Sequence, residues 1–419
     1  MSAPKLKAPR GTFDIVGEQA AAREALEAKA RALLGAAGYE RIETPVFEAT
    51  ELFSRGVGAS TDIVSKEMFS FDDGSGRSLT LRPEGTAAVC RAYIEHGMHK
   101  RRQPVKLWYL SSFFRHERPQ DGRYREFWQI GAEAIGSEDP AVDAESIVLL
   151  ATLLAEAGVQ SVKLRLASLG SPEARVEYRE LLQAHLRANE DRLSAEVRAR
   201  IDLNPLRAFD TDHPGTKEVM STAPLLLDHL DEEDLDHFAE VRAMLDAAGV
   251  QYVIDPTLVR GLDYYTRTLF EFTSAALGAQ SGVAGGGRYD RLVEQLGGPA
   301  TPGMGWAAGV ERMMLAGEAQ HYPPAPLELF VAVGESSGEV RREAFALLVE
   351  ARSAGLAAQM ELAGRSLKGQ LGQASSLGAR FVAIVGSGQT ALRDMQAGTQ
   401  QELPRETVVH AVLRSHHAL

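Results

Sequence analysis

The chain has 419 residues, of which 44% are hydrophobic and 24% are charged, and this is the composition of an ordinary soluble globular protein of two or three domains. Its apolar runs are far shorter than the roughly 20 residues that a membrane helix needs. No apolar stretch follows the lysines near the amino terminus, so we expect a cytoplasmic protein with no membrane partner. The single cysteine, Cys90, excludes an intramolecular disulfide and a zinc site built from several thiolates. The net charge of −12 does not exclude nucleic acid, because binding depends on where positive charge is concentrated.

The first part of the chain predicts a helix and then a series of strands. A helix is expected over 18–36, where Leu26, Ala30 and Leu34 recur at helical spacing. A strand should follow over 39–47, with Pro45 at an edge or bend. The further predicted strands are Ser78–Arg82, Val105–Phe114, Glu126–Ile135, Leu258–Thr273 and Val283–Gly285. Several of these follow one another without a crossover helix, so the sheet should be largely antiparallel.

Strand signals vanish between about 172 and 252, where polar helices are predicted over 173–193 and 234–248 around a loop at 204–210. Because strands resume afterwards, we interpret this stretch as a helical insertion in a first domain of residues 1–322. A proline-rich hinge at 322–326 precedes a second domain, 326–419. Alternating strand and helix patterns there predict a small α/β domain with a largely parallel sheet. The whole chain is thus predicted to be α+β.

The familiar nucleotide-binding and hydrolase motifs are missing or poorly supported. No G-x-x-x-x-G-K-[ST] sequence occurs, which excludes a P-loop. Gly303–Ala308 fits only the alanine-ended dinucleotide fingerprint and follows a proline loop, so we interpret its glycines as letting a helix pack closely. Ser336 stands in a G-x-S-x-G sequence, but too little chain follows for most of a hydrolase sheet, and a turn capping the next helix explains it. His96 and His99 have helical ligand spacing without an acidic third ligand, so metal binding is not favoured.

Cations are concentrated between His99 and Arg125, which favours an anionic ligand over a plain solvated surface. In the strand that follows, Gln129, Gly131 and Glu133 should share one face. That face is either a half-exposed surface or the floor of a polar pocket, in which Gly131 leaves room for a ligand. A cationic loop beside a carboxylate suits a zwitterionic substrate next to a polyphosphate.

A second group of polar and glycine residues lies later in the chain, at 258–267 and 284–290. Its three consecutive glycines either bring the backbone close to another group or mark a bulge. Arg312 is expected near the start of an apolar helix, where its charge opposes the helix dipole, so binding of an anion is the more economical explanation.

These residues resemble class II aminoacyl-tRNA synthetases, and among them the histidyl-tRNA synthetase family, over nearly the whole chain. Gly38–Glu48 resembles motif 1, Phe114–Gln129 resembles motif 2, and Gly309–Leu315 resembles motif 3. Leu79–Thr86 is also found in sister subclasses. The two signatures specific to this family are similar to Leu258–Tyr265 and Ala284–Asp290.

The resemblance implies an antiparallel class II catalytic core, a helical insertion and a carboxy-terminal anticodon-binding domain. It implies a histidine–tRNA ligase that uses ATP and Mg2+ to form histidyl-adenylate and then charges tRNA(His). It also implies a homodimer assembled through the motif 1 region.

Particular residues take roles by the same resemblance. Arg115 and Arg260 would grip the α-phosphate and stabilise the transition state. The nucleotide would also be held by Glu117, Arg123, Phe127 and Arg312, with Phe127 stacked on adenine. The α-amino group of histidine would meet Glu84, Thr86 and Gln129, and the imidazole would meet Glu133, Tyr264 and Tyr265. Gln120 would contact the tRNA acceptor end, and no residue of the chain is assigned to a metal.

The chain departs from the family at Glu126 and Trp128, where relatives often carry glutamine and histidine, and in a short segment at 386–400. One alternative is the synthetase-like regulatory subunit that assists histidine biosynthesis, but that paralogue generally lacks the carboxy-terminal domain and degrades the Arg260 region. A pure RNA-binding protein is a further alternative, and it would have no need of the grouped carboxylates and tyrosines.

Overall fold

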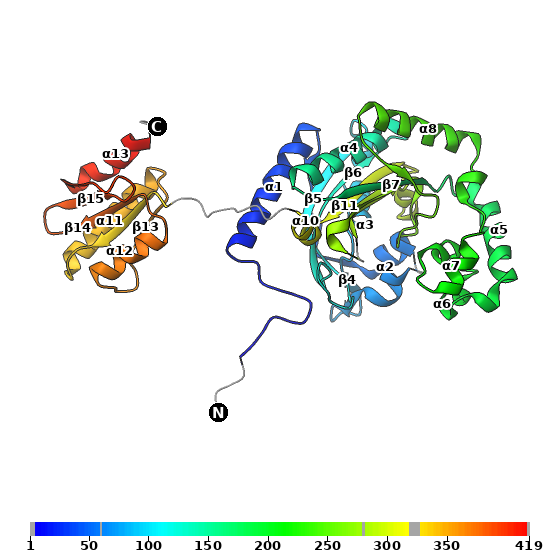
Figure 1. Ribbon diagram of the computed structural model, residues 1–419, viewed down its shortest axis with the longest axis horizontal. Coiled ribbons are helices and arrows are strands. Elements are labelled where there is room, and N and C mark those ends of the chain that lie inside the picture. Colours follow the sequence, from blue (N-terminus) through cyan, green and yellow to red (C-terminus); the bar gives the residue numbers. More distant parts are fainter. Residues whose placement is uncertain (1–4, 59–60, 279–280, 318–326, 417–419) are drawn as a thin grey trace. The chain divides into compact units, whose positions relative to one another are not determined.

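The structure, a computed structural model, describes residues 5–58, 61–278, 281–317 and 327–416 (Figure 1). The chain divides into two compact units, Met1–His321 and Tyr322–Leu419. The hinge predicted at 322–326 lies outside the described residues. Within the described ranges, no helix combines the length and apolar character required to cross a membrane.

An eight-stranded sheet organises the large unit, in the order β1-β5-β6-β11-β10-β9-β7-β8. The strands are β1 (Glu40–Arg41), β5 (Val105–Phe114), β6 (Glu126–Ile135), β7 (Val162–Ser168), β8 (Val253–Ile254), β9 (Thr266–Ser274), β10 (Gly282–Arg288) and β11 (Gly303–Gly309). All pairs from β5 to β7 are antiparallel, which confirms the predicted character of the sheet. The outermost pairs, β1 with β5 and β7 with β8, are parallel.

The two faces of this sheet are covered by different helices. On β5, Trp108 and Leu110 face one core, and Leu107 and Tyr109 face another, as the alternation of a strand requires. The first face packs against α1 (Glu18–Ala36), α4 (Pro140–Glu156), α8 (Glu232–Ala247) and α10 (Val310–Ala316). The second packs against α3 (Thr86–Glu95) and α9 (Leu292–Gln295). A small sheet of β2 (Phe47–Ala49), β4 (Ser78–Leu81) and β3 (Phe69–Asp72), with α2 (Thr50–Phe53), adjoins this side (Figure 1).

The helices inserted between β7 and β9 have a core of their own. Helices α5 (Ala174–Ala188), α6 (Ala195–Arg200) and α7 (Pro214–Met220) bury Tyr178, Leu182, Val197 and Val219 together. Helix α8 instead packs Phe238, Val241 and Leu245 into the main core. The self-contained part therefore ends near Leu230, before the predicted limit at 252. The loop predicted at 204–210 is a 3-10 helix, Pro205–Asp210.

Two strand predictions and one interpretation of a glycine motif in the large unit need correction. The strand expected over 39–47 is divided between β1 and β2, which belong to different sheets, with Pro45 between them. The strand expected from Leu258 begins only at Thr266. The glycines at 303–308, interpreted as letting a helix pack closely, belong instead to the central strand β11. Its glycines are needed because a Cβ atom at Gly305 would lie 1.8 Å from Oε2 of Glu133.

The small unit contains a five-stranded sheet in the order β13-β12-β14-β15-β16. Its elements are β12 (Leu329–Val333), α11 (Gly338–Ser353), β13 (Ala358–Met360), α12 (Leu367–Ser376), β14 (Phe381–Val385), β15 (Thr390–Asp394), β16 (Gln400–Leu403) and α13 (Arg405–His416). The parallel pairs β13–β12–β14 match the predicted alternation, whereas the antiparallel β15 and β16 were not predicted. The Ser337 hydroxyl caps α11 by accepting from the backbone N–H groups of Glu339 and Val340, in agreement with a capping turn next to Ser336.

Candidate active site

A cavity of about 690 Å3 opens in the large unit beside β6, β10 and the loop that precedes β9. Arg115 follows β5, Phe127 and Gln129 stand on β6, and Arg260 lies in the loop before β9. Seven of the residues predicted from the sequence line this one cavity: Arg115, Glu117, Arg123, Phe127, Gln129, Arg260 and Arg312. The tertiary structure thus brings the two distant cationic segments together.

Arg115 is oriented by groups on both sides of its guanidinium. Its Nε donates to the Pro83 carbonyl at 2.9 Å, and its Cζ lies 5.2 Å from the centroid of the Phe127 ring. Glu117 is 3.9 Å away from Arg115 and 3.4 Å from Arg123. The carboxylate of Glu117 therefore stands between two cations at the wall of the cavity.

Arg260 is held by a chain of ion pairs that the sequence reasoning missed. Its Nη1 donates to Oε1 of Glu271 at 2.5 Å. Oε2 of Glu271 accepts from Arg165 at 3.0 Å, and Arg165 also donates to Asp255 at 2.7 Å. A Cβ atom at Gly285 would lie 3.0 Å from Nη2 of Arg260, so one of the three consecutive glycines makes room for this side chain. An acidic residue on β9 between Phe270 and Phe272 was the signal that could have identified Glu271.

Burial and neighbouring charges shift the pKa values of two groups that line the cavity. The pKa of Arg312 is lowered, first by burial and then by the nearby charge of Arg123. Burial raises the pKa of Glu67, and the carboxylate of Glu117 raises it further. Such a site favours a polyanion, which would relieve the repulsion between neighbouring guanidinium groups.

The residues predicted for the amino acid form a buried cluster next to this cavity. Thr86 donates to Oε1 of Glu133 at 2.8 Å, and the Tyr264 hydroxyl donates to Glu84 at 3.4 Å. Glu84 also accepts from the backbone N–H groups of Thr86 and Ala87 at 2.8 and 3.0 Å, at the start of α3. The rings of Tyr264 and Tyr265 lie 4.8 Å apart. The described lining of the cavity includes Gln129 but none of the buried five, Glu84, Thr86, Glu133, Tyr264 and Tyr265.

Glu133 is the most strongly perturbed member of this cluster. Its side chain is fully buried, and burial raises the pKa of its carboxyl to about 8. The Tyr289 hydroxyl donates to its Oε2 at 2.7 Å. Tyr289, which the sequence reasoning did not assign to the site, belongs to the cluster. The signal for it was its place directly after the glycine-rich strand.

Comparison with known proteins agrees with this arrangement. The model of the family described as Histidyl-tRNA synthetase matches residues 11–313. The chain belongs to the histidyl-tRNA synthetase family. It is 46% identical to the histidine--tRNA ligase of Desulforamulus reducens, over 97% of this chain and 99% of that one. The corresponding protein of Desulforudis audaxviator is 47% identical, over 97% of this chain and 98% of its own length.

A solved structure extends the comparison to the fold. The apo histidyl-tRNA synthetase of S. aureus has a TM-score of 0.80 and 34% identity, and the match covers 97% of this chain and all of that one. The class II core with a carboxy-terminal α/β unit, which the resemblance implied, is confirmed.

One of the two alternatives for the polar face of β6 was that Gly131 leaves room for a ligand, and in this member of the histidyl-tRNA synthetase family that room is taken by a side chain of the protein. A Cβ atom at Gly131 would lie 2.2 Å from the Tyr109 ring, and one at Gly85 would lie 2.5 Å from it. The two glycines therefore accommodate the buried Tyr109 side chain between β6 and the start of α3.

Several other predicted residues lie away from the cavity. Gln120 is exposed in a tight turn, where its backbone pairs with that of Arg123. The first half of the basic segment does not reach the cavity, because Arg101 pairs with Glu40 and Lys106 pairs with Glu145. The described residues contain no group of three or more His, Cys, Asp or Glu side chains suited to a metal ion.

Trp128, a motif 2 residue at which the chain departs from the family, faces the side of the sheet that packs against α1 and α10. The guanidinium of Arg23 in α1 lies 4.3 Å from the centroid of its ring, and its backbone N–H donates to Glu311 in α10. Phe127 and Gln129, on either side of it, face the cavity. A tryptophan at this position is therefore tolerated because it packs on the opposite face of the sheet.

Proposed function

We propose that this chain activates L-histidine with ATP and transfers the histidyl group to tRNA(His), as a histidine–tRNA ligase. The observation that carries the proposal is that Arg115 and Arg260 line one cavity, directly beside a buried cluster of carboxylates and phenols. Membership of the histidyl-tRNA synthetase family and relatives named histidine--tRNA ligase over almost their whole length support it.

In the first step, a carboxylate oxygen of histidine attacks the α-phosphorus of ATP and pyrophosphate leaves. Arg115 and Arg260 stabilise the negative charge that grows on the α-phosphate oxygens. Arg123 and Arg312 neutralise the remaining phosphates, and Phe127 provides the surface on which adenine stacks. In the second step, a terminal ribose hydroxyl of the tRNA attacks the carbonyl carbon of histidyl-adenylate and AMP leaves.

The carboxylates of the cavity fit a magnesium ion bound together with ATP. Glu67 and Glu117 both line the cavity, and the pKa of Glu67 is raised, first by burial and then by the charge of Glu117. Magnesium is usually held by one or two carboxylates together with substrate phosphates. These two residues would hold the ion, and the ion would neutralise part of the negative charge of the phosphates.

Histidine recognition is assigned to the buried cluster and Gln129. Glu84, Thr86 and Gln129 bind the α-amino group, because a desolvated ammonium requires anionic and neutral acceptors. Glu133, Tyr264 and Tyr265 bind the imidazole, and we add Tyr289 because it donates to Glu133. A site that hydrogen-bonds a polar side chain rejects analogues lacking that group by roughly 10⁴ or more without editing.

The remaining partners are assigned from the family and from exposed surfaces. Gln120 contacts the acceptor end of the tRNA, and the small unit binds the anticodon. A homodimer forms through the motif 1 region, in which Phe47 is 50% exposed. Phe47 packs edge to face on Phe71 of β3, which is 44% exposed, on the small sheet. Cytoplasmic location stays a prediction.

The decisive test is an ATP–pyrophosphate exchange assay run with each of the twenty amino acids, in which only histidine should support exchange. Arg260→Ala should lower histidine-dependent exchange by roughly 10²–10³ while leaving tRNA binding largely intact. Arg101→Ala, which removes an arginine away from the cavity, is the matched control. Unchanged exchange in Arg260→Ala would refute its role. Binding of a phosphoribosyltransferase by a wild-type protein that shows no exchange would favour the regulatory paralogue.

A further inference from the structure

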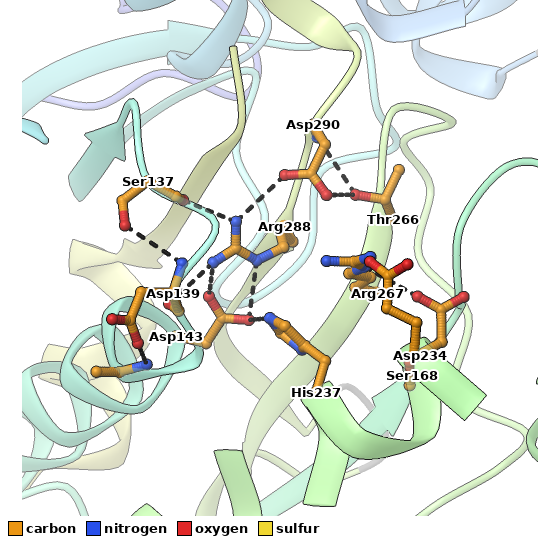
Figure 2. Close-up of polar contacts among 12 residues, drawn as sticks. Ser137, Asp139, Asp143, Ser168, Asp234, His237, Thr266, Arg267, Arg288 and Asp290 are labelled. Carbon is orange, nitrogen blue, oxygen red and sulfur yellow. Dashed lines mark hydrogen bonds and ion pairs between the residues drawn. The ribbon is translucent and has the colours of Figure 1, made fainter. Parts of the chain in front are cut away.

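A second polar network lies behind the buried cluster, around Arg288 at the end of β10 (Figure 2). The side chains of Arg288 and of Asp143 in α4 are both fully buried, with 0% exposure. Asp143 binds the guanidinium with both carboxylate oxygens, from Nη2 at 2.6 Å and from Nε at 3.1 Å. The Arg288 side chain points toward α4, on the face of the sheet that also packs against α8, and it does not line the cavity.

Every N–H group of this guanidinium has an acceptor. Besides the two bonds to Asp143, Nη1 donates to the Ser137 carbonyl at 2.9 Å and to Asp290 at 3.3 Å, and Nη2 donates to the Asp139 carbonyl at 3.2 Å. An arginine has five donors in a rigid planar fork, so the position and orientation of this side chain are strongly restricted.

The network holds the residues next to Tyr265 and Tyr289. Asp290 accepts from the Thr266 hydroxyl at 3.0 Å, and its backbone N–H donates back to the same oxygen at 3.2 Å. Thr266 directly follows Tyr265, and Asp290 directly follows Tyr289, so one reciprocal pair of hydrogen bonds links the two signature segments. The Tyr289 hydroxyl then reaches Glu133 at 2.7 Å.

Helix α8 supplies two further neighbours of this network. His237 lies 3.7 Å from Asp143, and burial lowers the pKa of this histidine to about 4. Near neutral pH the imidazole is therefore uncharged, and the ionic partner of Asp143 is Arg288. Asp234 of the same helix binds Arg267 at 2.9 Å, next to Thr266 (Figure 2).

A buried ion pair is weak evidence for stability, because well-packed apolar residues of similar volume often stabilise a fold equally well. The arrangement around Arg288 therefore calls for another role. We propose that Arg288 and Asp143 are positioning residues for amino-acid recognition: they fix the Arg288–Asp290 and Tyr265–Thr266 segments, and through them the phenol hydroxyls at the imidazole site. This inference rests on the proposed function, and it names residues that do not touch the substrate.

The test separates positioning from stability by removing both charges together. In Asp143→Leu/Arg288→Met, both members of the fully buried pair are removed, and Asp290, which loses the Arg288 guanidinium, is partly exposed and keeps its hydrogen bond from Thr266. The large unit should therefore unfold at nearly the wild-type denaturant concentration. Because the fork that holds Ser137, Asp139 and Asp290 is lost, the KM for histidine in the exchange assay should rise roughly 10- to 100-fold, the cost of small misplacement at a site. The KM for ATP should stay within about twofold.

A second variant acts at the other end of the network. Thr266→Val keeps the shape of the side chain and the Arg288–Asp143 pair but removes the hydroxyl that binds Asp290, and it should also raise the KM for histidine selectively. It decides the matter if the double variant does not fold. Glu145→Gln, which removes an ion pair with Lys106 from the same helix α4, is the control and should leave both KM values unchanged.

Direct binding of histidine, measured by titration calorimetry, distinguishes the ways in which the inference can fail. If the wild-type protein binds histidine and exchanges pyrophosphate, while folded variants keep the wild-type KM for histidine, the positioning role is refuted alone. A parallel rise of the KM values for histidine and ATP would refute it as well. A wild-type protein that neither binds histidine nor exchanges pyrophosphate would overturn the proposed function and this inference with it.

Discussion

The titration of Glu133 gives a quantitative prediction for stability. Burial raises the pKa of this carboxyl from an ordinary value of 4.5 to about 8, so the folded protein holds a proton that the unfolded chain releases. Folding is therefore disfavoured progressively as the pH rises above the pKa of the unfolded chain. Glu133→Gln keeps the shape of the protonated acid and cannot ionise, so it should remove this pH dependence.

The size of the effect follows from the two pKa values. One unit of pKa corresponds to about 1.4 kcal/mol, so the difference between 4.5 and about 8 amounts to about 5 kcal/mol in the free energy of unfolding. Below pH 4.5 the variant and the wild type should differ little. Between that pH and about 8 the wild type should lose stability relative to the variant, by about 3 kcal/mol at pH 7, and above 8 the difference should level off.

Urea unfolding followed by tryptophan fluorescence is the appropriate measurement. All three tryptophans, Trp108, Trp128 and Trp306, lie in the large unit, so the signal reports on the unit that contains Glu133. Glu24→Gln, at an exposed position of α1, controls for the removal of one negative charge. A difference between wild type and Glu133→Gln that stays constant from pH 5 to pH 8 would show that Glu133 is ionised throughout and would refute the reasoning.

Three further substitutions test the cavity and its support. Glu271→Gln weakens the ion pair that holds Arg260, so it should lower kcat of pyrophosphate exchange by roughly 10-fold, the range for losing a charged hydrogen bond. The KM for histidine should change little. An unaltered kcat would show that Arg260 does not need this ion pair. Phe127→Ala should raise the KM for ATP by roughly 10-fold, since stacking on a base contributes about 1–3 kcal/mol, and a KM that stays at the wild-type value would exclude stacking there. Gly131→Ala should destabilise the large unit by about 1–3 kcal/mol in urea unfolding, because its methyl group would overlap the Tyr109 ring; wild-type stability with a raised KM for histidine would instead restore the idea of a ligand space.

The elements with strong local signals were predictable from the sequence. The apolar spacing of 18–36 predicted α1 with its observed limits, and the alternation of 126–135 placed Gln129 and Glu133 on the face opposite Ile130. Strand β11 was missed because its glycines carry no alternation of apolar and polar side chains. Their meaning is visible only when the side chain of Glu133 lies against Gly305.

The residue types of the site, and the motifs in which they stand, were determined by the sequence alone. Which of them meet was decided by the sheet, because β6 is distant in the chain from β9 and β10 and is brought close to them by β11, which pairs with both β6 and β10. The tertiary structure also shows that Gly131 accommodates Tyr109, that Glu271 holds Arg260, and that Tyr289 belongs with Glu133. Local sequence can specify a side chain and its direction from a strand, but the partner across the sheet depends on how the whole chain buries its apolar surface.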